Sequence, residues 1–374
     1  MREFAVKLEK KNEDLSGFSI KEEQEFLKRF KNPKDDIERS YFQYCCQMRK
    51  NKPIITFLLN IISLPIIIFY LIKPKDRIDN YSKCQGVFFS DGKPFNIIPT
   101  SLKNNLVSIY VVEEKQESIT REDLIFLCRI FLRYPLSWHF LLKILIKVRF
   151  YCYEIIKRSP SSIIVCNEYS FTSSVMTYYC MLKGIQHFNI MHGEKIFDIQ
   201  DSFFRFDRCY VWDNYYKELF INLKAEPHQF IVEIPESLKF PNTSTEEKKI
   251  DYTYYLGWEE GEKLSKIVEI MHDIKQRGYR VAIRPHPRYT KMDELMKLAR
   301  YIQVEDFKTL KIEESLFRTR NAISIFSTVL NQAYYNGVSV VIDDISDPQK
   351  YKKIVETNYI MLCKPHICLS ELFK

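Results

Sequence analysis

The 374-residue sequence predicts an α/β protein built from two doubly wound units with parallel sheets. Three observations favour this fold class. Short apolar runs typical of buried strands alternate with helix-patterned segments from residue 84 to residue 342. A polar stretch with two prolines, 235–249, divides this alternation into two sets. The length leaves room for two domains of ordinary size.

The N-terminal region, 1–82, is expected to be a helical and hydrophobic extension that associates with a membrane. Its charged first part predicts helices over Ile20–Phe30 and Asp36–Met48. The following run, Ile54–Ile72, carries no charge. A spanning helix needs about 20 apolar residues, so this run is just long enough. Pro65 predicts a kink near its middle.

Three arrangements remain open for this apolar run: a spanning helix, a segment lying in the membrane interface, and a buried helical pair. Basic residues flank both ends, so the positive-inside rule gives no orientation. The interfacial arrangement is favoured, because the flanks would meet anionic lipid head groups. The flanking residues are Arg49, Lys50 and Lys52 before the run and Lys73, Lys75 and Arg77 after it.

The first α/β set occupies 83–235 and the second occupies 250–350, with 236–249 as the linker. Residues 351–374 are expected to add a strand or helix that packs back. Strands are predicted in the first set at 86–89, 106–112, 162–166, 186–191, 208–212 and 230–233, and in the second at 252–256, 279–283, 301–304, 322–326 and 338–342. Helices are predicted between them at 121–156, 171–182, 214–223, 262–276, 291–298, 313–318 and 328–335.

The composition limits the classes of protein and of partner that the sequence suits. Hydrophobic residues are 46% and charged residues 28%, which is typical of a globular chain. The net charge of +8 is spread along the sequence, which suits an anionic substrate or membrane face and argues against nucleic acid as a partner. Only 9 glycines are present, and no glycine-rich nucleotide loop appears. Most of the 10 cysteines fall in apolar patterns, so reduced thiols in a cytoplasmic protein are expected.

A phosphate site is predicted at the strand ends of the second set. Arg284-Pro285-His286-Pro287-Arg288 follows one apolar run, and Ser327-Thr328 follows another and opens a helix. Ligands collect at the carboxyl ends of parallel strands, and capping hydroxyls with free amides at a helix start bind anions. Each piece alone would be an ordinary turn or N-cap. Together they favour a phosphate group held by Arg284, His286, Pro287, Arg288, Ser327 and Thr328.

The first set offers a general base at a strand end. His192-Gly193-Glu194 follows an apolar run, and Gly193 would let the backbone turn as His192 leaves the sheet. Either His192 or Glu194 could take a proton from an acceptor hydroxyl. A solvated turn is the competing explanation. Further acceptor-side candidates, each of which also suits a turn or helix start, are Asp91, Glu168 and Asp198.

No metal site is predicted. Asp343-Asp344-Ile345-Ser346-Asp347 has carboxylates but no second ligand cluster, so a turn after a strand is the better explanation. The loop Gly257–Gly261 contains two glutamates that would repel a phosphate, so a helix cap or a hydrogen bond to a sugar or base is expected there. A nucleophile elbow is absent, which argues against a serine hydrolase.

These motifs resemble those of the two-domain GT-B glycosyltransferases of bacterial surface polysaccharides. The matching pieces are Met191-His192-Gly193, Asp207–Trp212, Arg284–Pro287 and Ser327-Thr328, within about residues 84–345. The chain is similar to bacterial sialyltransferases and polysialyltransferases, and to CDP-glycerol glycerophosphotransferases, which carry a His-Gly and an Arg-x-His-Pro. The sialyltransferases use an acidic base in an Asp/Glu-Asp/Glu-Gly motif, where this chain has His192-Gly193-Glu194.

The resemblance implies two Rossmann-like domains facing a central cleft, an acceptor domain followed by a nucleotide-sugar donor domain. It implies an inverting, metal-independent enzyme without a cofactor, which moves sialic acid from CMP-sialic acid to a lipid-linked O-antigen or capsule intermediate. The expected location is the cytoplasmic side of the inner membrane. Two alternatives stay open: a CDP-glycerol-type glycerophosphotransferase, and a non-catalytic scaffold for polysaccharide assembly.

Overall fold

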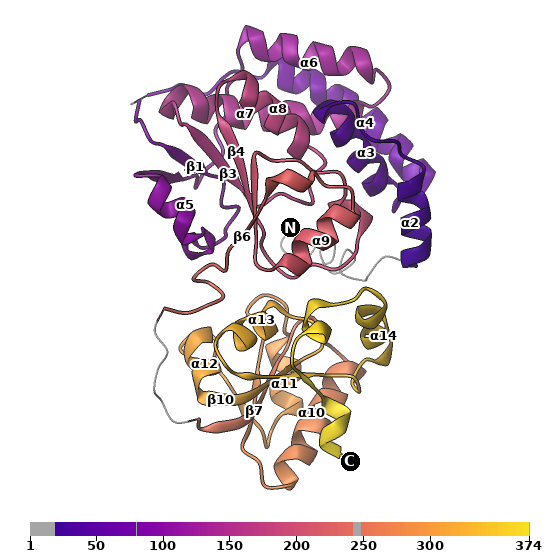
Figure 1. The fold of residues 1–374 in the computed structure, drawn as a ribbon, viewed down its shortest axis with the longest axis vertical. Helices are drawn as coiled ribbons and strands as arrows, with labels where there is room; N and C mark the ends of the chain where they lie inside the picture. The colour runs from indigo at the N-terminus through magenta and orange to yellow at the C-terminus, as the bar shows by residue number, and fades with distance from the viewer. Residues whose placement is uncertain (1–18, 80, 242–247, 374) are drawn as a thin grey trace. The chain divides into compact units, whose positions relative to one another are not determined.

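The computed structural model describes residues 19–79, 81–241 and 248–373 and divides the chain into two compact units (Figure 1). The N-terminal unit comprises residues 19–192 and 197–235, and the C-terminal unit comprises 193–196 and 236–373. Residues 1–18 of the predicted N-terminal region and residues 242–247 of the predicted linker lie outside the described residues.

Six parallel strands form the sheet of the N-terminal unit in the order β2-β1-β3-β4-β5-β6. Phe88, Ile164 and Phe188 stand in register across β1, β3 and β4, so these strands end together at one edge. The strand order reverses between β1 and β3, which is where a doubly wound sheet opens a crevice for ligands. The strands are β1 (Gly86–Phe88), β2 (Ile109–Val111), β3 (Ser162–Val165), β4 (Gln186–Ile190), β5 (Arg208–Val211) and β6 (Phe230–Val232).

The helices before the first strand are part of the N-terminal unit. A capping box of Ser19 and Glu22 begins α2, and the Asp35 side chain accepts from the Glu38 amide to begin α3. Helix α3 packs on α8, and α4 and α6 both pack on α7. The helices are α2 (Ile20–Lys28), α3 (Asp36–Met48), α4 (Pro53–Ile72), α5 (Thr100–Asn105), α6 (Arg121–Arg133), α7 (Trp138–Arg158), α8 (Ser173–Leu182) and α9 (Asn214–Asn222), with short 3₁₀ turns η1 (Phe95–Ile97), η2 (Ile199–Asp201) and η3 (Pro227–Gln229).

The C-terminal unit has a second parallel six-stranded sheet, in the order β12-β11-β10-β7-β8-β9. Here the order reverses between β7 and β10. The strands are β7 (Ile250–Tyr255), β8 (Val281–Arg284), β9 (Gln303–Val304), β10 (Thr319–Ser324), β11 (Ser339–Ile342) and β12 (Ile367–Cys368). The helices are α10 (Glu262–Gln276), α11 (Met292–Leu298), α12 (Ile312–Arg318), α13 (Thr328–Tyr335) and α14 (Pro348–Glu356), with η4 (Ile360–Cys363) and η5 (Leu369–Phe373).

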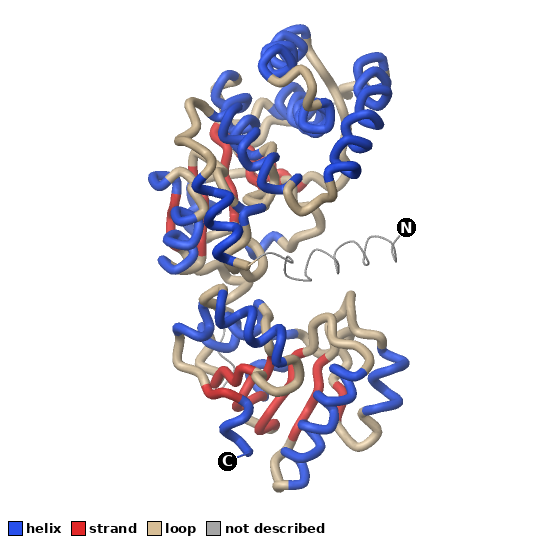
Figure 2. Tube along the Cα trace, turned by 90° about the vertical axis from the view of Figure 1, so that its right-hand side faces the viewer, coloured by secondary structure: helices blue, strands red, loops and turns tan. Residues whose placement is uncertain are grey.

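In each unit, helices lie against the strands of the sheet (Figure 2). Each unit has its own hydrophobic core. Phe88, Ile164 and Phe188 belong to the core of the N-terminal unit. Tyr254, Ile283 and Ile323 of three neighbouring strands contact the buried face of α10 in the C-terminal unit. The α/β fold class is confirmed: each unit is Rossmann-like, with a doubly wound parallel sheet and flanking helices.

Most predicted elements form close to their predicted bounds, and the helices 262–276 and 328–335 form at those bounds. The segment predicted as one or two helices over 121–156 is two, α6 and α7. The apolar run forms α4 as one helix that continues through Pro65. Helix α5 was not predicted. Helix α14 begins after the Asp343–Asp347 segment interpreted as a turn and extends into 351–374, where a strand or helix was expected.

Candidate active site

His192 and Glu168 lie together at the carboxyl edge of the N-terminal sheet. His192 follows β4, Glu168 follows the neighbouring β3, and Gly193 adopts φ 71°, a left-handed conformation that glycine takes readily. His192 Nδ1 is 3.7 Å from Glu168 Oε1, an ion-pair separation longer than a hydrogen bond. The Glu168 side chain is fully buried and that of His192 is 20% exposed. A buried carboxylate thus lies beside one ring nitrogen of a histidine that solvent reaches.

The Glu168 carboxylate is held by further contacts. Its Oε2 accepts a hydrogen bond from Asn189 Nδ2 at 3.1 Å, and Asn189 Oδ1 accepts from the Asn167 amide at 2.7 Å. Gln43 of α3 donates to the Glu168 carbonyl at 3.0 Å. These bonds connect the segment that follows β3 with strand β4 and with helix α3. Elements distant in the sequence therefore fix the orientation of Glu168.

Asp91 lies on the other side of the switch point, after β1. It adopts φ 48°, and its carboxylate is paired with Lys115. Lys147 of α7 is half-buried, and its Nζ donates at 3.3 Å to the side-chain oxygen of Asn167 when that amide is oriented to satisfy both of its neighbours. Burial lowers the pKa of Lys147 to about 8, and the nearby Asp91 charge opposes the shift. The crevice between β1 and β3 therefore has both signs of charge.

The other two acceptor-side residues have different surroundings. Asp198 Oδ1 accepts from the Gln200 amide at 2.8 Å, capping η2, and Oδ2 pairs with Lys50 at 2.7 Å. Glu194 belongs to the C-terminal unit, where its carboxylate accepts a hydrogen bond from Asn331 Nδ2. The two bases predicted at this turn therefore differ in their contacts. His192 lies beside the buried carboxylate of Glu168, whereas Glu194 contacts a side-chain amide.

In the C-terminal unit, Arg284 ends β8 with its guanidinium turned into the protein. Nη1 donates to Glu305 Oε2 at 3.1 Å, and Nη2 donates to the Leu310 carbonyl at 2.8 Å. Ser315 Oγ donates to the same Glu305 oxygen. Arg284 is 7% exposed. Its contacts hold the end of β8 to β9 and α12, whereas Pro287 and Arg288 further along the motif are exposed.

His286 is held in a defined orientation. Its backbone N–H donates to Thr290 Oγ1 at 2.8 Å, and its Nδ1 accepts from the Arg288 amide at 3.1 Å. Burial lowers the pKa of His286 to about 4, with Arg288 adding to the shift and Glu259 opposing it. The imidazole is therefore neutral at pH 7. Because Nδ1 accepts a hydrogen bond, the ring proton is placed on Nε2, which is a donor.

His286 is the first of three stacked rings. Its imidazole lies 4.2 Å from the Tyr289 ring at 14°, and Tyr289 stacks on Trp258. Trp258 comes from the loop after β7, so the stack joins the ends of two neighbouring strands. In the same loop Glu259 accepts from the Gly257 amide at 2.6 Å, and Glu260 pairs with Lys291 at 2.7 Å. The loop glutamates are thus engaged within the C-terminal unit.

Ser327 and Thr328 begin α13 on the other side of β7. Ser327 Oγ accepts from the Val329 amide at 3.2 Å, which makes it the N-cap, and Thr328 is the first helical residue. Both are half-buried. Strands β8 and β10 each pair with β7, so at about 4.8 Å per strand the ends that carry His286 and Ser327 are about 10 Å apart.

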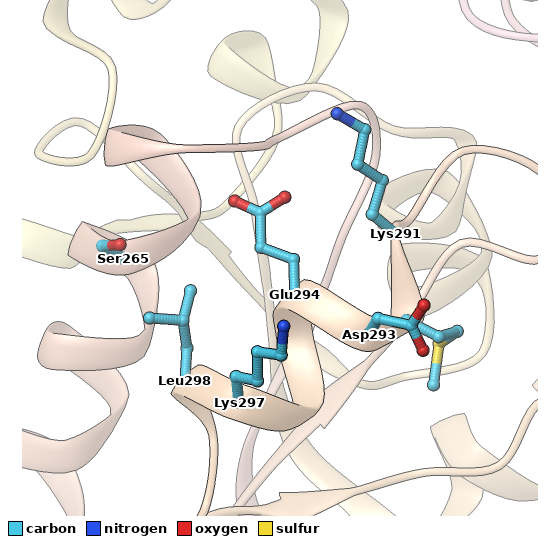
Figure 3. A pocket seen from close by; sticks show the side chains of 7 residues that line it. Ser265, Lys291, Asp293, Glu294, Lys297 and Leu298 are labelled. Atoms are coloured by element: carbon cyan, nitrogen blue, oxygen red, sulfur yellow. The ribbon is translucent and has the colours of Figure 1, made fainter.

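Two hollows in the described part of the chain lie away from these strand ends. One of about 530 Å³ is lined by α10 and α11 residues with side chains of both charges (Figure 3). There Glu294 accepts from the Gly261 amide at 2.7 Å. A second, of about 250 Å³, lies on the same pair of helices. None of the predicted site residues lines either hollow.

The described residues contain no group of three or more His, Cys, Asp or Glu side chains arranged to hold a metal ion. Asp343 is a turn residue: its Oδ1 accepts from the Ile345 and Ser346 amides at 2.9 Å, and Tyr254 donates to Oδ2 at 2.6 Å. All ten cysteines are free thiols, and Cys128 and Cys363 are the exposed ones.

Sequence reasoning missed Asn189, Lys147 and the Trp258–Tyr289 stack. Asn189 and Lys147 interrupt apolar segments, β4 and α7, and a polar residue at such a position is a usable signal. Trp258 follows a predicted strand end, where an aromatic residue can face a ligand. Neither signal identifies which partner the side chain contacts.

No protein-family model and no curated protein sequence matches the chain. Among solved structures, UDP-GlcNAc 2-epimerase of Methanocaldococcus jannaschii in complex with UDP-GlcNAc and UDP is 14% identical, with 76% of this chain and 88% of that chain covered and a TM-score of 0.47. The Neisseria meningitidis UDP-GlcNAc 2-epimerase is 13% identical over 72% and 85%, with a TM-score of 0.44. The wall teichoic acid polymerase TagF is 10% identical over 81% and 82%, with a TM-score of 0.40. These are likenesses of fold alone.

Proposed function

We propose that the protein is an inverting transferase that moves a group from a cytidine-nucleotide donor to a hydroxyl of a lipid-linked saccharide. The observation that carries the proposal is the pairing of His192 with the buried Glu168 at the edge of the N-terminal sheet. A solvent-accessible histidine beside a buried carboxylate suits a general base.

In the proposed reaction, His192 Nε2 accepts the proton of the acceptor hydroxyl. The Nδ1 side faces Glu168, whose negative charge stabilises the imidazolium that forms. Placing the proton on Nδ1 leaves Nε2 with its lone pair toward the acceptor. Glu194 is the weaker candidate, because its carboxylate is engaged with Asn331.

The C-terminal unit is proposed to hold the donor phosphate. His286 contributes the Nε2 hydrogen as a neutral donor, because its pKa is lowered to about 4. The amides at the start of α13 and the Thr328 hydroxyl add donors. Arg284 stabilises the end of β8 through its contact with Glu305. The exposed Arg288 is proposed to approach the phosphate.

For a CMP-sialic acid donor, the acceptor oxygen forms a bond to the anomeric carbon as the bond from that carbon to the phosphate oxygen breaks. CMP leaves with the bonding electron pair, and the proton passes to His192. Direct displacement inverts the anomeric centre. Hydrogen-bond donors fixed around the phosphate act where charge develops on the leaving group, so the proposed steps require no metal ion.

A second candidate donor is CDP-glycerol, which is favoured by one observation. The base position holds a histidine, His192, whereas the sialyltransferases that the chain resembles have an acidic residue there. In that case the acceptor oxygen would attack phosphorus and CMP would again leave. Both candidates share the cytidine nucleotide and the same site residues.

A donor panel tests the proposal. The purified protein would be incubated with CMP-, CDP- and UDP-activated donors and a saccharide acceptor, with and without EDTA, and CMP or UDP release would be measured. Release of CMP from CMP-sialic acid or CDP-glycerol that is lost in His192→Ala supports it. Release of UDP only, or an absence of both turnover and CMP-dependent thermal stabilisation, overturns it and favours the scaffold alternative.

A further inference from the structure

Helix α4 turns its polar side chains toward the protein and its apolar side chains outward, the reverse of a surface helix on a water-soluble protein. The side facing α7 carries its polar residues: Thr56 and Asn60 are half-buried and Ser63 is 2% exposed. The outward side is apolar throughout, with eleven large apolar side chains exposed between Ile54 and Ile72. A surface helix in water turns its apolar stripe to the core and its polar face outward. The outer face of α4 therefore suits an apolar surrounding.

Polar contacts fix α4 along α7. Asn60 Oδ1 accepts from the His139 amide at 3.1 Å. At the other end, the buried Arg149 donates to the Tyr70 carbonyl at 2.8 Å and pairs with Glu117 at 3.0 Å. From Asn60 to Tyr70 the helix is about 15 Å long, so both contacts hold it against the N-terminal unit over much of its length.

The chain on both sides of α4 belongs to the same unit. Before it, α3 is fixed by Gln43, which donates to the Glu168 carbonyl, and by Ser40, which accepts from the Val175 amide at 2.8 Å. After it, the Asp76 amide donates to the Glu117 carbonyl at 2.9 Å. One spanning helix would place these two flanks on opposite sides of a bilayer. Although α4 has the length and composition to cross a membrane, this packing is incompatible with crossing.

The ends of α4 carry exposed positive charge. Lys52 precedes the helix, and Lys75 and Arg77 follow it, all exposed. The helix itself has no acidic residue, and the carboxylate of Asp76 accepts from the Glu117 amide. Basic residues at the margins of an apolar face are attracted to anionic head groups, whereas a second copy of the same face would bring like charges together.

We infer that α4 is an in-plane membrane-docking helix, which seats the N-terminal unit on an anionic lipid surface with its apolar face in the head-group and acyl boundary. The inference stands on packing and exposure and is independent of the proposed reaction. Docking of this unit on a bilayer would suit the proposed lipid-linked acceptor, because the proposed base, His192, belongs to the same unit.

Vesicle flotation tests the inference. The full chain should float with vesicles of phosphatidylcholine and phosphatidylglycerol and much less with phosphatidylcholine alone. Ile61→Asn/Ile68→Asn, on the exposed face, should lower the partition coefficient at least tenfold. The control Val107→Asn/Met296→Asn changes two apolar residues elsewhere that are more exposed than Ile61 and Ile68, and it should float as the wild type does. Unchanged circular dichroism and thermal unfolding would show that both variants fold.

Two further measurements distinguish an in-plane helix from a spanning helix and from a dimer interface. Lys52→Gln, Lys75→Gln and Arg77→Gln should each lower binding to anionic vesicles by roughly fivefold. Alkaline carbonate should release the bound protein, since an in-plane helix does not cross the bilayer. The inference is overturned by resistance to carbonate, by equal flotation of the double variant, or by a lipid-free dimer that the double variant converts to monomer. Activity on a soluble acceptor should not change in Ile61→Asn/Ile68→Asn, so failure here leaves the proposed function intact.

Discussion

His192 and Glu168 lie 3.7 Å apart, Nδ1 to Oε1, although 23 residues separate them in the sequence. Their strands are parallel neighbours in the sheet, so the segments that follow the two strand ends begin at the same edge. Glu168 has no exposed surface, so its charge acts mainly on the groups that it contacts. The base proposed for this protein is therefore a pair of residues.

Replacing Glu168 by Gln should lower the rate of transfer by about 10²-fold, because the imidazolium loses its counter-charge. The glutamine can still accept the hydrogen bond from Asn189, so the fold should persist. Steady-state kinetics and the pH dependence of kcat measure the effect. Asp198→Asn is the matched control, as that carboxylate caps η2 and pairs with Lys50. Equal loss in both variants would assign Glu168 a structural role.

His192→Ala should reduce kcat by about 10²- to 10⁴-fold while leaving CMP affinity unchanged, because the proposed base acts on the acceptor and the nucleotide is proposed to bind in the other unit. Isothermal titration with CMP, alongside turnover, separates the two effects. A large loss of CMP affinity with normal turnover at saturation would contradict the assignment.

His286→Ala should weaken nucleotide binding and reduce turnover by orders of magnitude, since the phosphate loses a fixed donor. The CMP-dependent thermal shift measures binding, with His272→Ala on α10 as the control. Because His286 has a pKa of about 4, affinity for a CMP-sugar should be nearly constant from pH 8 to pH 6. A steep rise in affinity over that range would mean that binding requires the protonated imidazole.

Arg284→Met should destabilise the C-terminal unit by about 3–5 kcal/mol, because Glu305 is left buried without its cation. The double variant Arg284→Met/Glu305→Leu should recover much of that loss. Denaturant unfolding measures both, and Arg288→Met, at an exposed position, should change stability little. If Arg284→Met abolished CMP binding without changing stability, a direct contact with phosphate would be indicated instead.

The stability of the N-terminal unit should fall as the pH drops below about 6.5. His187 is buried, with Tyr151 and Thr177 hydroxyls at 3.0 and 2.8 Å from its ring nitrogens, and burial lowers its pKa to about 3. The unfolded chain takes up a proton near pH 6.5 and the folded chain does not, so the free energy of unfolding decreases by about 1.4 kcal/mol per pH unit below that value.

Denaturant unfolding at pH 7.5 and pH 5.5 checks this dependence. His187→Gln should be less stable at pH 7.5 and should show a shallower decrease between the two values, while the exposed His228→Gln should behave as the wild type. An identical decrease in His187→Gln and the wild type would place the titrating group elsewhere, with His139, whose pKa burial lowers to about 4, as the next candidate.

The sequence by itself determined the class of fold and the strand-end positions of the main motifs. Alternation of apolar runs with helix patterns is a local property, and it placed His192, His286 and Ser327 within three residues of the ends of β4, β8 and β10. The same pattern identified α4 as an uncharged helix of spanning length. These features depend on spacing and side-chain chemistry within a few turns of chain.

Tertiary structure decided which of these residues meet. The sheet order joins Glu168 to His192, turns Arg284 toward Glu305, and stacks Trp258 and Tyr289 beside His286. It also packs both flanks of α4 into one unit, which no local pattern specifies. Strand order and helix packing depend on contacts between residues far apart in the chain, and burial by such contacts sets the low pKa of His286 and His187.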